Sequence, residues 1–245
     1  MSFNVAEHAG FLIDLDGTLT AGHELLPGAR SLLAAVEGRF AIVSNDSEHT
    51  PDQLARRFRE WRLSVPTERI VLAGVAALET AARDHAGGRL MLLGSPALRR
   101  MARNMGFELV EQDADVLIIA RDRRFTYGKL TAAVRAVRDG AEVLVACPDL
   151  SHPGPDGYPV PEAGALAAAL FAVTGPVPHR VIGKPQPALF ENASRRVGVP
   201  AGQCVVIGDN PVTDGAGAAG LGVPFWQVKP GRLPELLRET VMDVI

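Results

Sequence analysis

Short apolar runs alternate with longer amphipathic segments along almost the whole chain. The runs are rich in Val, Ile and Leu, which is typical of strands that are buried on both faces of a parallel sheet. We predict strands at 11–15, 40–44, 70–72, 90–93, 107–110, 116–120, 142–147, 179–182, 203–207 and 223–228. Helices are expected between most of them. This alternation predicts an α/β fold with a parallel sheet.

Several of the expected helices have clear start and stop signals. Thr50-Pro51 and Ser95-Pro96 each offer an N-cap residue followed by a proline at the first helical position. Glycines follow the segments 97–105, 130–139 and 188–197, where they favour the left-handed conformation that ends many helices. The sequence therefore predicts helices that end at these three points.

The segment 148–161 is unusual because it holds five prolines and two glycines. Such a composition excludes a helix or a central strand. Two interpretations remain open. The segment is either a stiff surface connection or a preorganised loop that presents side chains to a ligand.

Composition excludes several classes of function. Hydrophobic residues make up 47% of the 245 residues, charged residues 22%, and the formal net charge is -3. That balance argues against binding to nucleic acid or to an anionic membrane. No apolar run approaches the ~18 residues that cross a bilayer, and the N-terminus lacks the pattern of a signal peptide. Cys147 and Cys204 lie on apolar runs and are expected to be buried thiols, which fits a cytoplasmic location.

The first candidate for chemistry is the end of the first predicted strand. The run Phe11-Leu12-Ile13 leads into Asp14 and Asp16, which are followed by glycine and threonine. Two carboxylates at the end of a buried strand repel each other and lose solvation, unless a cation offsets the cost. Ligands gather at the carboxyl ends of strands in α/β sheets. The sequence therefore indicates a metal-assisted reaction at this strand end.

Three further polar motifs also follow predicted strands. They are Ser44-Asn45-Asp46-Ser47, Gly183-Lys184-Pro185 and Gly208-Asp209-x4-Asp214. If these strands share one parallel sheet, all four motifs face the same crevice. The order of the four motifs and their positions at strand ends together indicate one site.

This inventory of side chains suits phosphoryl transfer. Asp14 is a candidate nucleophile that forms an aspartyl-phosphate, and Asp16 is a candidate general acid and base. Asp209 and Asp214 offer the oxygen ligands that Mg²⁺ prefers. Lys184 would supply a fixed positive charge.

The hydroxyl and main-chain N–H of Ser44 would, with that lysine, hold the oxygens of the transferring group.

On these motifs the chain resembles the haloacid dehalogenase (HAD) superfamily, and within it the nitrophenylphosphatase and NagD-like branch. The branch is suggested by Leu26-Pro27-Gly28-Ala29, by the run 182–187 and by the long insert between the second and third motifs. The resemblance implies a doubly wound core with a Rossmann-like sheet, made of residues 1–74 and 177–245. It also implies an inserted α/β cap domain at 75–176 that selects the substrate.

The resemblance also implies a role for each matching residue. Asp14 would be the nucleophile and a Mg²⁺ ligand, and Asp16 the general acid and base with its main-chain carbonyl on the metal. Lys184 would orient the nucleophile. The remaining roles are phosphoryl binding by Ser44 and Asn45 and Mg²⁺ binding by Asp209 and Asp214.

Three positions depart from the pattern of this branch. Asp46 stands where relatives carry asparagine, so we expect it to point away from the phosphate or to pair with a lysine or arginine. Asn210 replaces a common arginine, and Cys147 replaces the first residue of an Asn-Pro-Asp motif. Asp46, together with Asp149 and His152 of the segment 148–161, is kept as a candidate substrate-binding residue.

The sequence thus predicts a cytoplasmic, Mg²⁺-dependent phosphatase that acts on a small soluble phosphomonoester. Two alternatives remain open, namely a phosphotransferase or mutase with the same intermediate, and a regulatory module that binds phosphate without turnover. A homodimer formed through the cap is expected by analogy with the branch.

Overall fold

The computed structural model describes residues 5–154, 156–229 and 233, and it divides the chain into two compact units. The first, which we call the core unit, takes residues 1–44, 51–71 and 184–245. The second, which we call the insert unit, takes residues 45–50 and 72–183. The ranges predicted for a cap and a core, 75–176 and 1–74 with 177–245, resemble this division. The short segment 45–50 nevertheless belongs to the insert unit, and residues 1–4, 230–232 and 234–245 of the predicted core lie outside the described residues.

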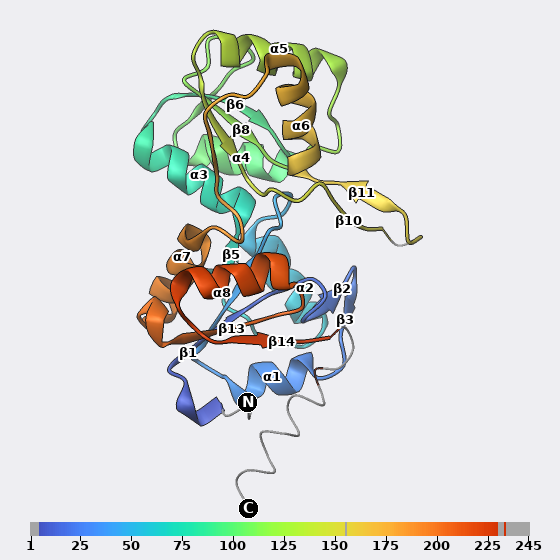
Figure 1. Cartoon of the computed structure of the whole chain (residues 1–245), viewed down its shortest axis with the longest axis vertical. Coiled ribbons are helices and arrows are strands. Elements are labelled where there is room, and N and C mark those ends of the chain that lie inside the picture. Colours follow the sequence, from blue (N-terminus) through green and yellow to red (C-terminus); the bar gives the residue numbers. More distant parts are fainter. Residues whose placement is uncertain (1–4, 155, 230–232, 234–245) are drawn as a thin grey trace, which may run out of the picture. The chain divides into compact units, whose positions relative to one another are not determined.

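The core unit is built on a five-stranded sheet in the order β14-β13-β1-β4-β5, of which Figure 1 labels β14, β13, β1 and β5. Its strands are β1 (Gly10–Ile13), β4 (Phe40–Ser44), β5 (Ile70–Leu72), β13 (Cys204–Gly208) and β14 (Phe225–Gln227). The pairs β1–β13, β1–β4 and β13–β14 are parallel. Every residue of β1, β4 and β13 is buried, as the continuous apolar runs predict.

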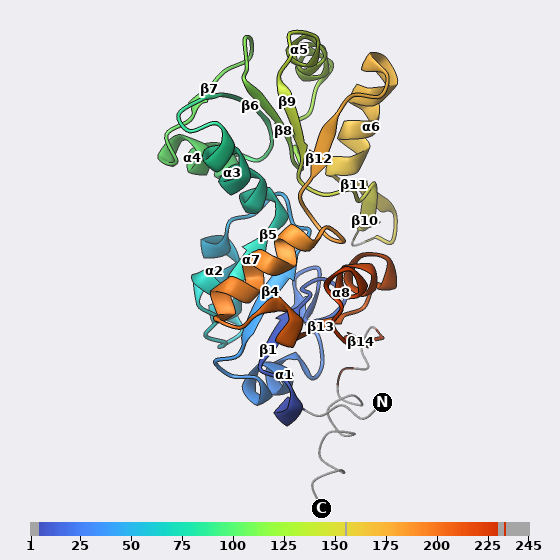
Figure 2. The same ribbon diagram turned by 60° about the vertical axis from the view of Figure 1, so that its left-hand side comes forward.

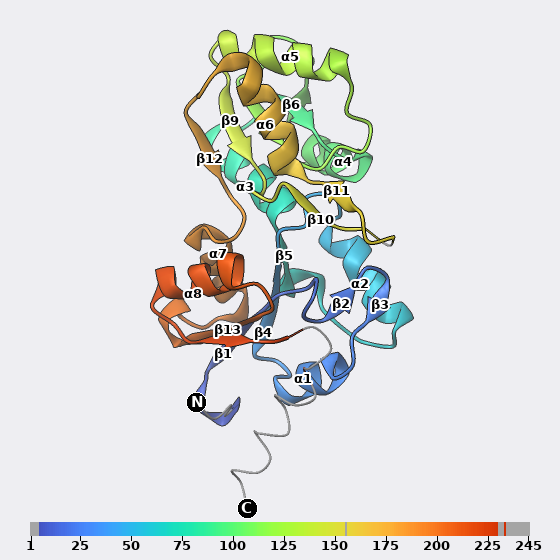
Figure 3. The ribbon, with the colours of Figure 1, turned by 45° about the vertical axis from the view of Figure 1, so that its right-hand side comes forward.

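Helices cover both faces of this sheet (Figure 3). On one face lie α1 (Ala29–Ala35) and α2 (Pro51–Glu60), and on the other α7 (Pro187–Val197) and α8 (Ala216–Leu221). The chain runs outward from β1 to β4 and β5, and returns to the opposite side of β1 at β13. This reversal makes the carboxyl ends of β1 and β13 the switch point of a doubly wound sheet, where ligands bind. The predicted fold class is therefore confirmed.

The insert unit has its own five-stranded parallel sheet, in the order β12-β9-β8-β6-β7. Its strands are β6 (Arg89–Leu93), β7 (Glu108–Leu109), β8 (Val116–Ile119), β9 (Glu142–Val145) and β12 (His179–Val181). Its helices are α3 (Ala73–Asp84), α4 (Pro96–Asn104), α5 (Tyr127–Arg138) and α6 (Ala163–Thr174). Figure 2 shows α3 and α4 on one face of the sheet and α5 and α6 on the other.

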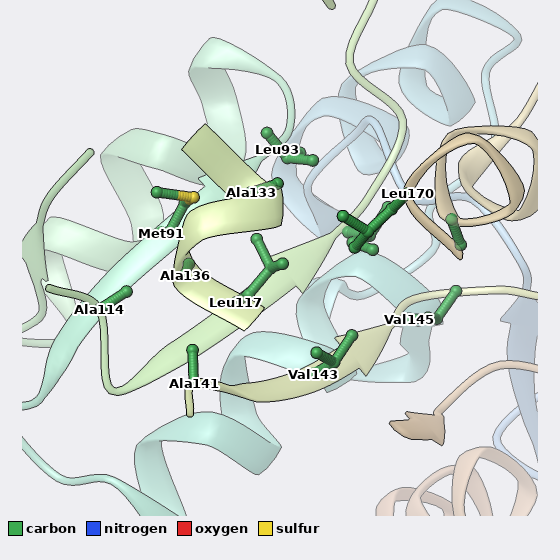
Figure 4. Packing of buried hydrophobic residues seen from close by; sticks show 12 residues of the cluster. Met91, Leu93, Ala114, Leu117, Ala133, Ala136, Ala141, Val143, Val145 and Leu170 are labelled. Carbon is green, nitrogen blue, oxygen red and sulfur yellow. The ribbon is translucent and has the colours of Figure 1, made fainter. Parts of the chain in front are cut away.

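Alternate strand residues build the core beneath α5 and α6 (Figure 4). Leu117, Val143 and Val145 pack there against alanines of α5 and against Leu170 of α6. The small alanine side chains let α5 lie close to the sheet. The insert unit therefore has a hydrophobic core of its own.

The predicted elements agree with the structure except near their ends. The strand predicted at 11–15 ends at Ile13, and the one predicted at 142–147 ends at Val145. The helix predicted at 97–105 starts earlier, at Pro96, where the Ser95 side chain accepts a hydrogen bond from the Leu98 N–H. Cys147 and Cys204 are buried and free, as expected.

The proline-rich segment forms a hairpin, in which β10 (Ser151–Pro153) pairs antiparallel with β11 (Pro159–Pro161). The sequence pattern predicts no strand in this segment. Prolines are tolerated because the hairpin has only two strands, so each has an edge with no ladder to complete. Pro155 lies outside the described residues.

None of the helices in the described part of the chain has both the length and the hydropathy that crossing a membrane would require.

Candidate active site

A buried lysine joins two aspartates at the carboxyl end of the core sheet. Lys184 Nζ lies 2.5 Å from Asp14 Oδ1 and 2.7 Å from Asp214 Oδ1. All three side chains are buried. Asp14 follows β1 directly, and its N–H donates to the Ile207 carbonyl on β13. The sheet itself therefore positions the first acid.

Three acids meet beside this lysine. Oxygens of Asp14, Asp209 and Asp214 lie within 4.8 Å of one another. Asp209 follows the last residue of β13, and Asp214 lies on a π-helical turn at Pro211–Gly215. Such turns are rare and often occur at functional sites. The predicted convergence of the first, third and fourth motifs is thus present within the core unit.

Two glycines make this close approach possible. A Cβ at Gly17 would lie 2.1 Å from Asp209 Oδ2, and one at Gly208 would lie 2.4 Å from the Asp214 carboxylate. Gly17 also has φ near +87°, which other residues adopt only with strain. Any larger residue at either position would displace an acid of the cluster.

The electrostatics of this cluster are unbalanced. Burial raises the pKa of Asp209, and the neighbouring Asp14 adds to the effect. Burial, with Asp14, also raises the pKa of Asp214 to about 6, although Lys184 opposes it. Burial alone would lower the pKa of Lys184, but Asp14 and Asp214 outweigh it and the net pKa is raised. One ammonium thus faces three carboxyl groups.

One oxygen of the candidate nucleophile stands out in this cluster. Asp14 Oδ2 is buried and has no hydrogen-bond partner within the described structure. An unpaired buried carboxylate oxygen is costly. The cluster offers three carboxylates, and one of their oxygens, Asp14 Oδ2, lacks a hydrogen-bond partner in the described structure. Such a set of oxygen ligands fits a hard divalent cation such as Mg²⁺.

Asp16 and Ser44 lie outside this acid cluster. Asp16 is exposed, and its Oδ1 lies 3.2 Å from the hydroxyl oxygen of Thr20. Its predicted metal contact is through the main-chain carbonyl, and this stays a prediction. Ser44 is the buried last residue of β4, the strand beside β1.

The other candidate binding residues belong to the insert unit. Asn45 donates from Nδ2 to Asp149 Oδ2 at 2.8 Å, so two predicted substrate-binding residues are in direct contact. His152 Nδ1, on β10, lies 2.7 Å from Glu162 Oε1. Burial, and after it the charge of Arg121, lowers the pKa of His152.

Asp46 is held by its own loop. Its Oδ1 accepts from the N–H groups of Glu48 and His49, and its Oδ2 lies 2.7 Å from His49 Nδ1. Burial alone would raise the pKa of Asp46, but the bonds and the charge of His49 lower it. The expected basic partner is therefore a histidine rather than a lysine or arginine. These contacts give Asp46 a structural role in the loop, and its predicted contact with substrate stays a prediction.

Sequence reasoning missed the role of Arg121, whose position after a predicted strand is typical of a solvated turn. Its guanidinium lies 3.4 Å from Glu48 and 3.3 Å from Glu162. Its main-chain N–H donates to Ser47 Oγ. No local pattern in the sequence shows that these residues meet, because they come from separate parts of the insert unit.

The chain is similar in sequence to known proteins. A sequence profile of haloacid dehalogenase-like hydrolases matches residues 11–108, and a second HAD-hydrolase-like profile matches 181–240. A dihydroxyacetone phosphatase of Corynebacterium glutamicum is 28% identical over 83% of this chain and 74% of its own length. An acid sugar phosphatase of Staphylococcus aureus is 28% identical over 92% of this chain and 88% of its own length.

Solved structures show the same likeness. The 4-nitrophenylphosphatase of Thermotoga maritima matches with a TM-score of 0.85 and 29% identity over 95% of this chain and 90% of its own. A glycerol phosphate phosphatase of Mycobacterium tuberculosis, solved in complex with calcium, matches with a TM-score of 0.84 and 31% identity over 94% of this chain and 68% of its own.

The chain belongs to the haloacid dehalogenase-like hydrolases, in the branch of the 4-nitrophenylphosphatases and NagD. It is a phosphatase of that family.

Proposed function

We propose that this phosphatase requires Mg²⁺ and hydrolyses a small soluble phosphomonoester through an aspartyl-phosphate on Asp14. The observation that carries the proposal is the buried cluster in which Lys184 holds Asp14 Oδ1 while Asp14 Oδ2 has no hydrogen-bond partner in the described structure. A carboxylate held in this way is oriented for attack, and its second oxygen is available to bind a cation or phosphorus.

The metal would be held by Asp14, Asp209 and Asp214, with the main-chain carbonyl of Asp16. When bound, Mg²⁺ would supply positive charge that lowers the repulsion between these acids and a phosphate dianion. The excess of carboxyl groups over ammonium groups supports this assignment.

The chain's own residues carry the two chemical steps. An oxygen of Asp14 forms a bond to phosphorus as the bond from phosphorus to the leaving oxygen breaks, and Asp16 gives that oxygen a proton. Asp16 then takes a proton from a water molecule that attacks phosphorus. The bond between phosphorus and Asp14 breaks, and inorganic phosphate leaves. Lys184 and Ser44 would stabilise the charge on the phosphoryl oxygens.

We further propose that the insert unit acts as a cap and selects the substrate. Asn45 follows Ser44 directly in the chain but belongs to the insert unit, and it donates to Asp149 there. Three of the relatives are named dihydroxyacetone phosphatase, acid sugar phosphatase and glycerol phosphate phosphatase. For this chain we therefore propose a sugar or polyol phosphate.

Phosphate release tests the proposal. The purified chain is assayed on 4-nitrophenyl phosphate and on a panel of sugar, polyol and nucleoside phosphates, with Mg²⁺ and with a chelator. We expect turnover only with Mg²⁺ and a fall of at least about 10³-fold for Asp14→Asn, because the nucleophile is lost. Acid quenching and mass spectrometry should find a phosphoryl group on the peptide that carries Asp14.

Three results would contradict the proposal. Release of phosphate from no member of the panel would favour a regulatory module. Transfer to an added acceptor alcohol in place of water would favour a phosphotransferase. Substantial activity of Asp14→Asn would remove the assigned nucleophile.

A further inference from the structure

The hydroxyl of Thr20 lies beside the carboxyl group of Asp16. Thr20 Oγ1 is 3.2 Å from Asp16 Oδ1 and 3.2 Å from the carbonyl oxygen of Leu15. Thr20 is 2% exposed, whereas Asp16 is exposed. A buried hydroxyl thus contacts an exposed acid, and neither the motifs nor the proposed function gives this hydroxyl a role.

Main-chain hydrogen bonds fix Thr20 at this point without using the Asp16 side chain. The Leu15 carbonyl accepts from the N–H groups of Leu19 at 2.8 Å and of Thr20 at 2.9 Å. The Gly17 N–H donates to the Thr20 carbonyl at 2.7 Å. Thr20 then starts β2 (Thr20–Ala21), where it pairs with Leu25 of β3 (Glu24–Leu25). The Thr20 hydroxyl is therefore positioned by the hydrogen-bonded turn at 15–20 and by the hairpin of β2 and β3.

An exposed carboxyl group transfers protons efficiently only if a rigid partner holds it in one orientation. General acid catalysis requires the acid within hydrogen-bond reach of the leaving oxygen, and free rotation about χ1 and χ2 reduces the time spent there. A hydrogen bond from a rigid hydroxyl restricts that rotation. A carboxyl group that accepts at Oδ1 also carries its acidic proton on Oδ2.

We propose that Thr20 is a positioning residue for Asp16, whose hydroxyl orients the carboxyl group for proton transfer to the leaving oxygen. This inference rests on the proposed function. Thr20 keeps its own proton throughout. The proton that reaches the leaving oxygen comes from Asp16, as the bond from phosphorus to that oxygen breaks.

The role has a kinetic signature that a structural role lacks. A nitrophenolate leaves readily without a proton, whereas the alkoxide of a polyol phosphate must be protonated as it leaves. Loss of orientation at Asp16 should therefore slow the alkyl substrate much more than the aryl substrate. It should change kcat rather than KM, because Thr20 contacts the acid and not the substrate.

The test compares Thr20→Val, Thr20→Ser and the wild type on glycerol phosphate and 4-nitrophenyl phosphate. Valine keeps the shape but removes the hydroxyl, and the Leu15 carbonyl still has its two main-chain donors. For Thr20→Val we expect kcat on glycerol phosphate to fall at least about tenfold and kcat on 4-nitrophenyl phosphate less than about threefold. Thr20→Ser should restore most of the alkyl activity.

Thr174→Val is the matched control. Its hydroxyl donates to main-chain carbonyls of Leu170 and Gly175 at the end of α6 and touches no acid. This variant should hydrolyse both substrates at the wild-type rates. Activity of Thr20→Val on the aryl substrate shows that it is folded.

An unchanged ratio of the two kcat values in Thr20→Val, whether both values fall equally or neither falls, would overturn the inference while leaving the proposed function intact. A wild-type protein that hydrolyses neither substrate would overturn the proposed function itself, and the inference with it.

Discussion

Single residues set the geometry of the acid cluster, and glycine does so by its lack of a side chain. Gly17 and Gly208 each leave room for a carboxylate at a distance that no Cβ would allow. Gly17 additionally requires the left-handed region, where other residues are strained. The position of Asp209 therefore depends on a residue that carries no functional group.

A Gly17→Ala substitution should weaken metal binding. The new Cβ would lie 2.1 Å from Asp209 Oδ2 and force that carboxylate out of the cluster. We expect the Mg²⁺ concentration that gives half-maximal activity to rise at least about tenfold, the loss of roughly 1.4 kcal/mol of binding. Titration of activity with Mg²⁺ measures this change.

Gly22→Ala is the control for that experiment. Gly22 has φ near +58°, but a Cβ added there would meet no atom within 4 Å, so the variant carries the strain without the clash. Equal Mg²⁺ dependence in the two variants would show that strain alone, and not displacement of Asp209, causes the effect.

The contacts of Asp46 give a second prediction at the residue scale. Its lowered pKa means that ionised Asp46 stabilises the fold above its ordinary titration range, and that this contribution is lost as the pH falls through the lowered pKa. Asp46→Asn should therefore cost about 1 kcal/mol in the free energy of unfolding at neutral pH, because the charged partner of His49 is removed.

Urea denaturation measures that cost, and steady-state kinetics tests the competing role. KM should stay at the wild-type value if Asp46 serves only its loop. A KM that falls several-fold would instead show that the extra carboxylate repels the phosphate of the substrate. Asp52→Asn, at an exposed position in the first turn of α2, is the control.

Among the elements, the hairpin of β10 and β11 is where sequence and structure differ most. Its prolines exclude a central strand, but they do not show that Ser151–Pro153 would find a partner in Pro159–Pro161. That pairing depends on a turn that is closed by a hydrogen bond from the Gly154 N–H to the Tyr158 carbonyl, which no periodicity in the sequence predicts. An ordered hairpin is compatible with both interpretations of this segment, namely a stiff surface connection and a loop that presents side chains.

We expect the hairpin to control substrate preference rather than metal use. His152→Ala should change the ranking of sugar and polyol phosphates, with changes of at least about tenfold in kcat/KM for some members, because a polar contact of about 1.4 kcal/mol would be lost. The Mg²⁺ dependence should not change, since His152 belongs to the insert unit and the acid cluster to the core unit.

His179→Ala, which alters an exposed histidine at the start of β12 in the same unit, is the control. A ranking that changes equally in both variants, or in neither, would contradict the role assigned to His152.

For the molecule as a whole, stability should depend on pH through Glu162. Burial raises the pKa of Glu162 to about 7, from an ordinary value of 4.5, although Arg121 opposes the shift. The folded state then binds more protons than the unfolded state between these two values. Stability from this group is thus present below pH 4.5 and is lost as the pH rises through about 7.

Glu162→Gln should remove this dependence. Between pH 5 and pH 8 we expect the wild type to lose about 1–3 kcal/mol of unfolding free energy relative to the variant. Urea denaturation with a chelator present measures both proteins without a contribution from metal binding. A constant difference between them across this range would show that Glu162 titrates normally.

The sequence alone determined the strands of the two parallel sheets, the fold class and the residues that meet in the acid cluster. Continuous apolar runs of this length, rich in Val, Ile and Leu, are typical of strands buried on both faces, and Asp14, Lys184 and Asp209 each follow such a run. The carboxyl ends of parallel strands lie at the same edge of a sheet. The order of the elements therefore predicted that these residues lie close together.

Tertiary structure alone decided the contacts that no period or spacing encodes. The segment 45–50 lies with the insert unit because Ser47, Glu48 and Asn45 find partners in Arg121 and Asp149, far along the chain. The geometry of the loops brings Asp46 into contact with His49, and Thr20 into contact with Asp16. A local pattern of apolar residues predicts which face of an element is buried. Hydrogen-bond partners depend instead on where separate loops lie in the folded protein.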